Sequence, residues 1–157
     1  MAFLGLTLVG CKEDNEDNVP PTGVVVVQNV NVRVKNTQGL DLLNPENANG
    51  IKAFKIYYLV GGEKKLYSNP SLDASGGYRL LKHPVNGYYY LQVLMDGGHN
   101  VAETKTLLQL GDNAELDTIR TQYKSDPSNI IPEKIWHNEQ LVWQTADGEP
   151  TFQIIQL

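Results

Sequence analysis

Few side chains in this sequence have the type and spacing that catalysis requires. The three histidines, His83, His99 and His137, are far apart, and none has another histidine at helix or hairpin spacing. The His-Glu-x-x-His pattern of zinc proteases and the Gly-x-Ser-x-Gly turn that presents a serine nucleophile do not occur. Each histidine is therefore predicted to be a solvated loop or strand-end residue. We expect no catalytic residue and no metal site, with a convergent hydrolase as a residual alternative, because convergent triads leave no sequence pattern.

An oxygen-rich segment is the nearest approach to a calcium loop. It contains Asp41, Asn44, Glu46, Asn47 and Asn49. Its spacing departs from the EF-hand pattern, and Pro45 interrupts it. Asn and Asp side chains bond their own backbone in such loops, so the segment is predicted to form Asx turns. Glycine patterns that bind nucleotide phosphates are missing, and no cofactor is predicted.

The run Tyr88-Tyr89-Tyr90 gives the strongest indication of a binding site. If Tyr89 points into the core with the alternate residues that follow it, Tyr88 and Tyr90 point outward. An exposed aromatic pair can stack on a sugar or on a partner surface. The alternative is that these tyrosines only satisfy β propensity, or that their sheet face is covered.

Length and composition indicate one globular domain. The chain has 157 residues, of which 41% are hydrophobic and 20% charged. These fractions are close to globular averages. The formal net charge is -5, and no segment carries a dense basic stripe. Nucleic acid is therefore not expected as a partner.

The only cysteine, Cys11, follows a short apolar run from Phe3 to Gly10. Leu8-Val9-Gly10-Cys11 resembles the bacterial lipobox, which implies a signal peptide over residues 1–10 and a lipid-modified Cys11 that anchors the chain in a membrane. Met1-Ala2 lacks the positive charge that usually opens a signal peptide. A frayed N-terminus with an incidental buried cysteine is the alternative.

The segment after Cys11 is predicted to be a solvated tether. Lys12 to Asn18 is polar and acidic, and Val19 to Gly23 contains two prolines that stop a helix. The Lys-plus-acidic stretch is similar to the signal that sends lipoproteins of Bacteroidetes-type bacteria to the outer face of the outer membrane. We therefore expect a tether over residues 11–23 and a folded domain over residues 24–157.

Alternating apolar residues predict strands throughout this domain. Period-two patterns occur in the segments 24–35, 54–60, 78–82, 89–95, 101–110, 116–123, 130–137 and 152–157. No segment sustains helical periodicity with caps for three turns. Short strands separated by Gly, Asn and Pro indicate an all-β, antiparallel β-sandwich.

Three connections are predicted to be hairpins. Gly61-Gly62 ends the strand over 54–60, and Asp96-Gly97-Gly98 is expected to turn the strand over 89–95 back into 101–110. If Asn138-Glu139 forms a two-residue turn, Ile135 faces Val142, and Trp136 and Trp143 are both predicted to be core residues.

Several stretches resemble a group of uncharacterised Bacteroidales lipoproteins. They are Gly39 to Pro45, Ile51 to Tyr58, Lys134 to Asn138 and Leu141 to Trp143. The resemblance implies an immunoglobulin-like or transthyretin-like sandwich on a lipid anchor, and it brings no activity.

The expected function is a non-enzymatic, surface-exposed binding or accessory module for a glycan, a peptide or a protein. The alternative is a structural subunit of an envelope or fimbrial complex that uses edge-strand pairing.

Overall fold

The structure is a computed structural model that describes residues 25–97, 101–112, 115–124 and 129–156. The predicted signal peptide, Cys11 and the tether up to residue 23 lie outside the described residues. Within the described ranges, no helix is long and apolar enough to cross a membrane.

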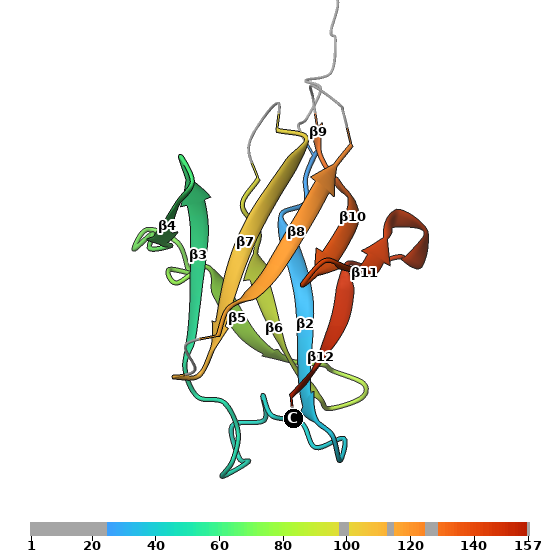
Figure 1. Cartoon of the computed structure of the whole chain (residues 1–157). Coiled ribbons are helices and arrows are strands. Elements are labelled where there is room, and N and C mark those ends of the chain that lie inside the picture. Colours follow the sequence, from blue (N-terminus) through green and yellow to red (C-terminus); the bar gives the residue numbers. More distant parts are fainter. Residues whose placement is uncertain (1–24, 98–100, 113–114, 125–128, 157) are drawn as a thin grey trace, which may run out of the picture.

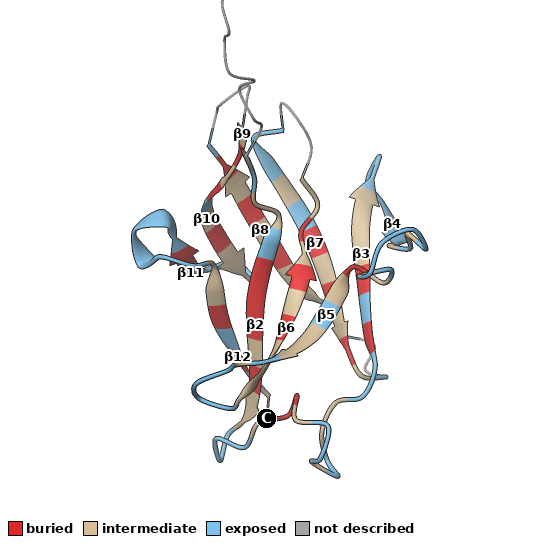
Figure 2. Cartoon of the chain, turned by 180° about the vertical axis from the view of Figure 1, so that it is seen from behind, coloured by how far each residue is buried: buried red, intermediate tan, exposed pale blue. Residues whose placement is uncertain are grey.

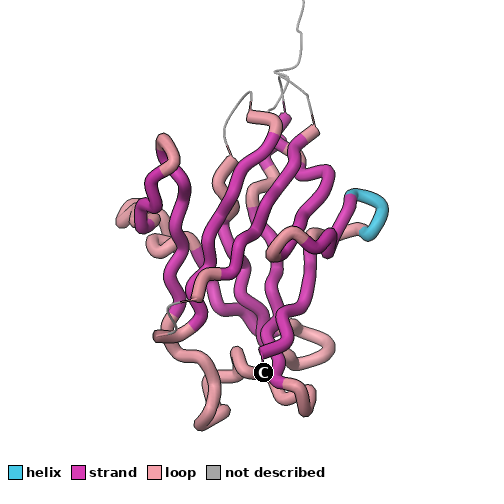
Figure 3. The backbone as a smooth tube through the Cα atoms, in the orientation of Figure 1, coloured by secondary structure: helices cyan, strands magenta, loops and turns pink. Residues whose placement is uncertain are grey.

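Two sheets face each other and confirm the all-β sandwich (Figures 1 and 3). The larger sheet contains, in spatial order, β11 (Gln140–Gln144), β10 (Pro132–His137), β8 (Asp117–Tyr123), β7 (Glu103–Leu110), β3 (Phe54–Val60) and β4 (Glu63–Leu66). The smaller sheet contains β12 (Thr151–Gln156), β2 (Asn29–Asn36), β6 (Tyr89–Leu94) and β5 (Tyr78–Lys82). A short pair joins β1 (Val25–Val26) to β9 (Asn129–Ile130), and η1 (Thr145–Asp147) is a single 3-10 turn.

The predicted alternation of side chains builds the core. Val30, Val32 and Val34 on β2 are fully buried, as are Leu91 and Val93 on the neighbouring β6. The larger sheet covers them with Ile56, Leu108, Ile119 and Ile135, all fully buried. Because alternate residues face inward, the intervening residues of every strand form the outer faces of the sandwich (Figure 2).

The first predicted strand is broken. Val26 is 48% exposed, although its parity matches that of the buried Val30. The chain leaves β1, which pairs with β9, and enters β2 at Asn29, so a single alternation does not run through both.

The second predicted hairpin is wrong. β6 belongs to the smaller sheet and β7 to the larger one, so the chain crosses between sheets after Met95. Threonines of β7 hold the crossing, since the Asp96 N–H donates to Thr106 Oγ1 at 2.8 Å and the Asp96 carbonyl accepts a bond from the Thr104 hydroxyl. The Tyr123 hydroxyl also donates to that carbonyl, at 2.9 Å. Both strands direct alternate side chains into the same core. The sequence pattern therefore does not show to which of the two sheets each strand belongs.

Two connections confirm the predicted turns. Val60 pairs with Glu63 across Gly61-Gly62, and both glycines have positive φ. Asn138 and Glu139 form the two-residue turn between β10 and β11, with φ of 46° and 67°.

A bulge changes the predicted register of the closing hairpin. Ile135 pairs with Trp143 instead of Val142, because the register shifts between Ile135 and Trp136. Trp143 is consequently a core residue, at 4% exposure. The prediction of a core position for Trp136 is wrong, since this side chain is half-buried on the outer face with the Arg120 guanidinium 3.7 Å from its ring.

The C-terminal strand departs from the antiparallel pattern. β12 runs parallel to β2, with Thr151 beside Asn31 and Gln156 beside Asn36. It lies at the edge of the smaller sheet, because the chain leaves the larger sheet after β11 and crosses through η1.

Candidate functional site

The outer face of the smaller sheet carries the candidate site, and we call it the tyrosine face. It includes the predicted ligand-binding residues Tyr88 and Tyr90, on the side opposite Leu91 and Val93, which are fully buried. The strand ladders bring outward side chains of four strands beside them. These neighbours are Asn31, Arg33, Lys35, Arg79, Leu81, Gln92 and Gln153.

The two tyrosines differ in what covers their rings. Both are half-buried, and their ring centroids are 6.4 Å apart in an edge-on arrangement. The Tyr88 ring stacks on the His83 imidazole at 4.8 Å, and the Arg33 guanidinium carbon lies 3.8 Å from the Tyr88 ring centroid. Tyr88 is therefore a packed support, and Tyr90 offers the freer ring.

The β5–β6 connection fixes His83 against Tyr88. The His83 N–H donates to the Tyr88 carbonyl at 2.8 Å, and the Gly87 N–H donates to the His83 carbonyl at 3.0 Å. The His83 Nδ1 accepts bonds from the N–H groups of Val85 and Asn86, each at 3.2 Å. These bonds hold the imidazole plane, so His83 is a structural residue of the tyrosine face.

Asn31 gives the tyrosine face a buried polar group. It is 8% exposed, and its Nδ2 donates to Glu149 Oε1 at 2.7 Å. That bond turns Oδ1 away from Glu149, and Oδ1 is buried without a donor among the described residues. A buried acceptor without a donor costs about 1–3 kcal/mol. Because the atom is buried, a ligand on the tyrosine face does not reach it in this conformation.

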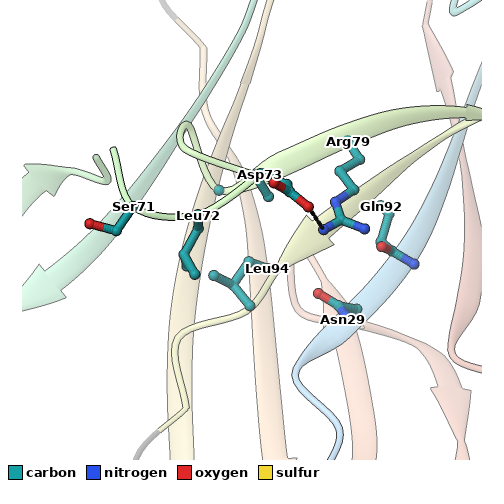
Figure 4. A pocket seen from close by; sticks show the side chains of 9 residues that line it. Asn29, Ser71, Leu72, Asp73, Arg79, Gln92 and Leu94 are labelled. Carbon is teal, nitrogen blue, oxygen red and sulfur yellow. Dashed lines mark ion pairs between the residues drawn. The ribbon is translucent and has the colours of Figure 1, made fainter. Parts of the chain in front are cut away.

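A pocket of about 340 Å³ extends the tyrosine face toward the start of β2 (Figure 4). Asn29, Arg79 and Gln92 give it polar groups, and Leu72 and Leu94 give it apolar surface. The loop before β5 closes one side, where Asp73 lies 3.6 Å from the Arg79 guanidinium. Asp73 is 94% exposed, so this ion pair is weak and leaves Arg79 available to a ligand.

A second pocket, of about 410 Å³, was not predicted from the sequence. It brings His137 together with Asp117 and Glu115, between the β10–β11 turn and the end of β12. His137 Nε2 lies 2.6 Å from Asp117 Oδ1, and the imidazole stacks on Phe152 at 5.4 Å. The pair can orient an imidazole for proton transfer to or from water.

This histidine–aspartate pair also has a structural role. Asp117 Oδ1 accepts a second bond, at 3.1 Å, from Asn138 Nδ2, and Asn138 Oδ1 accepts the Thr118 N–H at 2.8 Å. The bonds join the β10–β11 turn to the start of β8. The prediction of a strand-end position for His137 is confirmed, but its side chain is half-buried and paired.

The oxygen-rich loop forms Asx turns, as predicted. Asp41, Asn44 and Asn47 each accept the N–H of the residue two positions later, at 3.0 Å. The other carboxylate oxygen of Asp41 accepts the Tyr89 N–H at 2.8 Å and joins the loop to β6. Among the described residues, no group of three or more His, Cys, Asp or Glu could hold a metal ion. His99 lies outside the described residues.

A cluster at the sheet crossing contains three perturbed groups. Burial raises the pKa of Tyr123 to about 12, and it also raises the pKa of Tyr58 above its usual value. Burial raises the pKa of the Asp96 carboxyl group as well. Its carboxylate has no hydrogen-bond or ion-pair partner among the described residues, so the charged form is poorly stabilised.

No protein family model, no curated protein and no solved structure matches this chain. The resemblance to Bacteroidales lipoproteins thus remains a prediction, and the tyrosine face has to be interpreted from its own chemistry.

The raised pKa of Asp96 gives a prediction on stability. A carboxyl group whose pKa is raised in the folded state stabilises the fold below its unfolded pKa and loses that contribution as the pH rises through the folded pKa. Asp96→Asn removes the charge and keeps the backbone bonds. We expect this variant to melt at a higher temperature than the wild type at about pH 7 and at a similar temperature near pH 3.

Thermal unfolding followed by circular dichroism at the two pH values measures this difference. Asp112→Asn, at an exposed turn residue, is the matched control and should leave the melting temperature unchanged at both. An Asp96→Asn variant that gains nothing at neutral pH contradicts the interpretation.

Proposed function

We propose that this chain is a non-enzymatic, lipid-anchored surface protein that binds a glycan along the tyrosine face. The observation that carries the proposal is the outward pair Tyr88 and Tyr90, set among amide and cationic side chains on the outer face of the smaller sheet. An aromatic ring packs on the apolar face of a sugar. The amide of Gln92 suits its hydroxyl groups.

The dimensions of the tyrosine face favour an extended ligand. Tyr88 immediately precedes β6, and Leu94 ends this strand six positions later, which is about 20 Å at 3.3 Å per residue. The pocket beside Leu94 and Arg79 forms one end of this surface, and His83 and Tyr88 form the other. Several sugar units of one chain can lie along such a length.

The position of the tyrosines is compatible with a tether at the N-terminus. β1 and β9 lie at one end of the sandwich, and the β5–β6 connection lies toward the opposite end (Figure 1). An anchor at Cys11 would leave the Tyr88 end away from the membrane surface. Acyl chains on Cys11 would supply the membrane affinity without a spanning helix.

We place the binding function on the tyrosine face because the polar groups of the second pocket bond one another. His137 and Asp117 form a pair, and Asp117 also bonds Asn138. Turnover of an ester or a glycoside by the wild type, lost in His137→Phe, would favour the hydrolase alternative.

Loss of the two tyrosines should weaken glycan binding. We expect the Tyr88→Ala, Tyr90→Ala double variant to bind the glycan that the wild type captures on an array at least about tenfold more weakly, because stacking area and its support are both lost. Tyr57→Ala is the control, since Tyr57 is half-buried on the outer face of the other sheet and bonds Gln109 at 2.9 Å. Unchanged binding by the double variant refutes this site.

Lipid modification of Cys11 can be tested directly. Mass spectrometry of the mature chain purified from bacterial membranes should show an N-terminal acylated Cys11. Cys11→Ser should move the protein from the membrane fraction to the soluble fraction, since no acyl chain can then be added. An unmodified Cys11 in the mature chain removes the anchor from the proposal.

A second candidate function is supported by the position of β12. This strand lies at the edge of the smaller sheet, so one side of its backbone belongs to no ladder among the described residues. Such an edge can pair with a strand of another subunit. Ile155, at 50% exposure, would lie at this junction.

An assembly subunit should associate through β12. Ile155→Lys is then expected to reduce association seen by sedimentation and by cross-linking in envelope extracts, because a charge on an edge strand opposes strand addition. Purely monomeric wild-type protein in both measurements counts against this function.

A further inference from the structure

We infer that the ligand of the tyrosine face is an acidic polysaccharide, whose carboxylate or sulfate groups bind Arg33 and Lys35. This inference rests on the proposed glycan-binding function and adds the chemical class of the glycan. Its basis is a pair of cations on β2 that form no ion pair with any acid among the described residues.

Arg33 is half-buried, yet it has no hydrogen-bond acceptor or carboxylate among the described residues. Within the described part of the chain, its one interaction is with the Tyr88 ring, whose centroid lies 3.8 Å from the guanidinium carbon. A stacked guanidinium keeps its N–H donors in its own plane, away from the ring that covers one face. Those donors are therefore held in place without an acceptor from the described residues.

Arg120 shows what a neutralised version of the same arrangement looks like. Its guanidinium carbon lies 3.7 Å from the Trp136 ring centroid, on the outer face of the larger sheet. There Glu103 lies 2.9 Å from one guanidinium nitrogen and Glu139 lies 3.3 Å from another. The protein thus supplies two carboxylates to Arg120 and, among the described residues, none to Arg33.

Lys35 places a second positive charge on the same strand face. It follows Arg33 by two positions, which is about 7 Å along the strand. Lys35 is half-buried and has no ion pair among the described residues. Asp73 and Glu149 already interact with Arg79 and Asn31. Asp41 lies opposite Lys35 in an isolated bridge, and its two carboxylate oxygens accept the N–H groups of Leu43 and Tyr89.

This local charge is opposite in sign to that of the whole chain, which is -5. A planar guanidinium can bind a carboxylate or a sulfate through two parallel bonds, and an ammonium group adds a point charge beside it. A polysaccharide with regularly spaced anionic groups would contact both residues while a sugar ring lies on Tyr90. A neutral polysaccharide offers the Arg33 donors only hydroxyl and ring oxygens, and hydrogen bonds to these lack the strengthening that a charged acceptor gives.

Two pairs of polymers separate charge from sugar identity. Dextran sulfate and dextran share one backbone and differ in sulfate, and polygalacturonate and its fully methyl-esterified form differ in free carboxylate. We expect wild-type protein to bind the acidic member of at least one pair about tenfold or more tightly than the uncharged member, measured by isothermal titration calorimetry. This affinity should fall as salt rises from about 0.05 to about 0.5 M.

The Arg33→Gln, Lys35→Gln double variant should lose at least tenfold of the affinity for that acidic polymer. Lys64→Gln, Lys65→Gln removes the same charge from two exposed residues of β4 and should bind like the wild type. Circular dichroism checks that both variants are folded. With wild-type protein, the inference is overturned by equal affinity for the charged and uncharged members, or by no binding of either acidic polymer. With the variants, it is overturned by full affinity in the Arg33→Gln, Lys35→Gln variant, or by an equal loss in the control.

The outcomes also separate this inference from the function on which it rests. Tyrosine-dependent binding of a neutral glycan, unaffected by the Arg33 and Lys35 substitutions, keeps the proposed function and rejects the acidic ligand. Absence of binding to every glycan on the array and to all four polymers rejects both. The pair that shows the difference identifies the anion as sulfate or carboxylate.

Discussion

The burial of one face of each sheet against the other is the constraint on which this structure depends. Fully buried valines of β2 and Leu91 of β6 meet Ile56, Leu108 and Ile119 of the larger sheet. A side chain that turns inward is committed to this core, because burial of each one contributes about 1.5–3 kcal/mol. Ligands and partners are consequently left with the outer faces, the strand edges and the connections at the ends. The tyrosine face is one of the outer faces, and β12 is an exposed strand edge.

Local patterns in the sequence are sufficient for the elements but not for their partners. Alternation predicted β5 with the observed bounds, and Gly61-Gly62 and Asn138-Glu139 predicted their turns. Four features were missed: the break between β1 and β2, the crossing after Met95, the parallel pairing of β12 and the bulge at Ile135. Each depends on which distant strand lies alongside. A two-residue period shows which face of a strand is buried, but it does not show which strand pairs with it.

The candidate site was also predictable only in part from local sequence patterns. Parity alone placed Tyr88 and Tyr90 opposite the buried Leu91, whereas the packing of Arg33 on Tyr88 requires β2 to pair with β6. The pair of His137 with Asp117 likewise joins residues 20 positions apart through the β8–β10 ladder. No spacing rule connects such residues before the topology is known. The contacts of a polar residue on a predicted outer face therefore depend on which strand flanks it in the fold.

The parallel alignment of β12 with β2 has a consequence for biogenesis. Asn31 and Thr151 are neighbours in space but are separated by 120 positions, the difference between their residue numbers. The smaller sheet cannot close on the ribosome until residues 151–156 have been synthesised, so β2 keeps one edge open while residues 37–150 are made. Contacts of such long sequence separation slow folding. The β2–β12 ladder is consequently expected to form after the β2–β6 ladder, whose residues have all been synthesised by position 94.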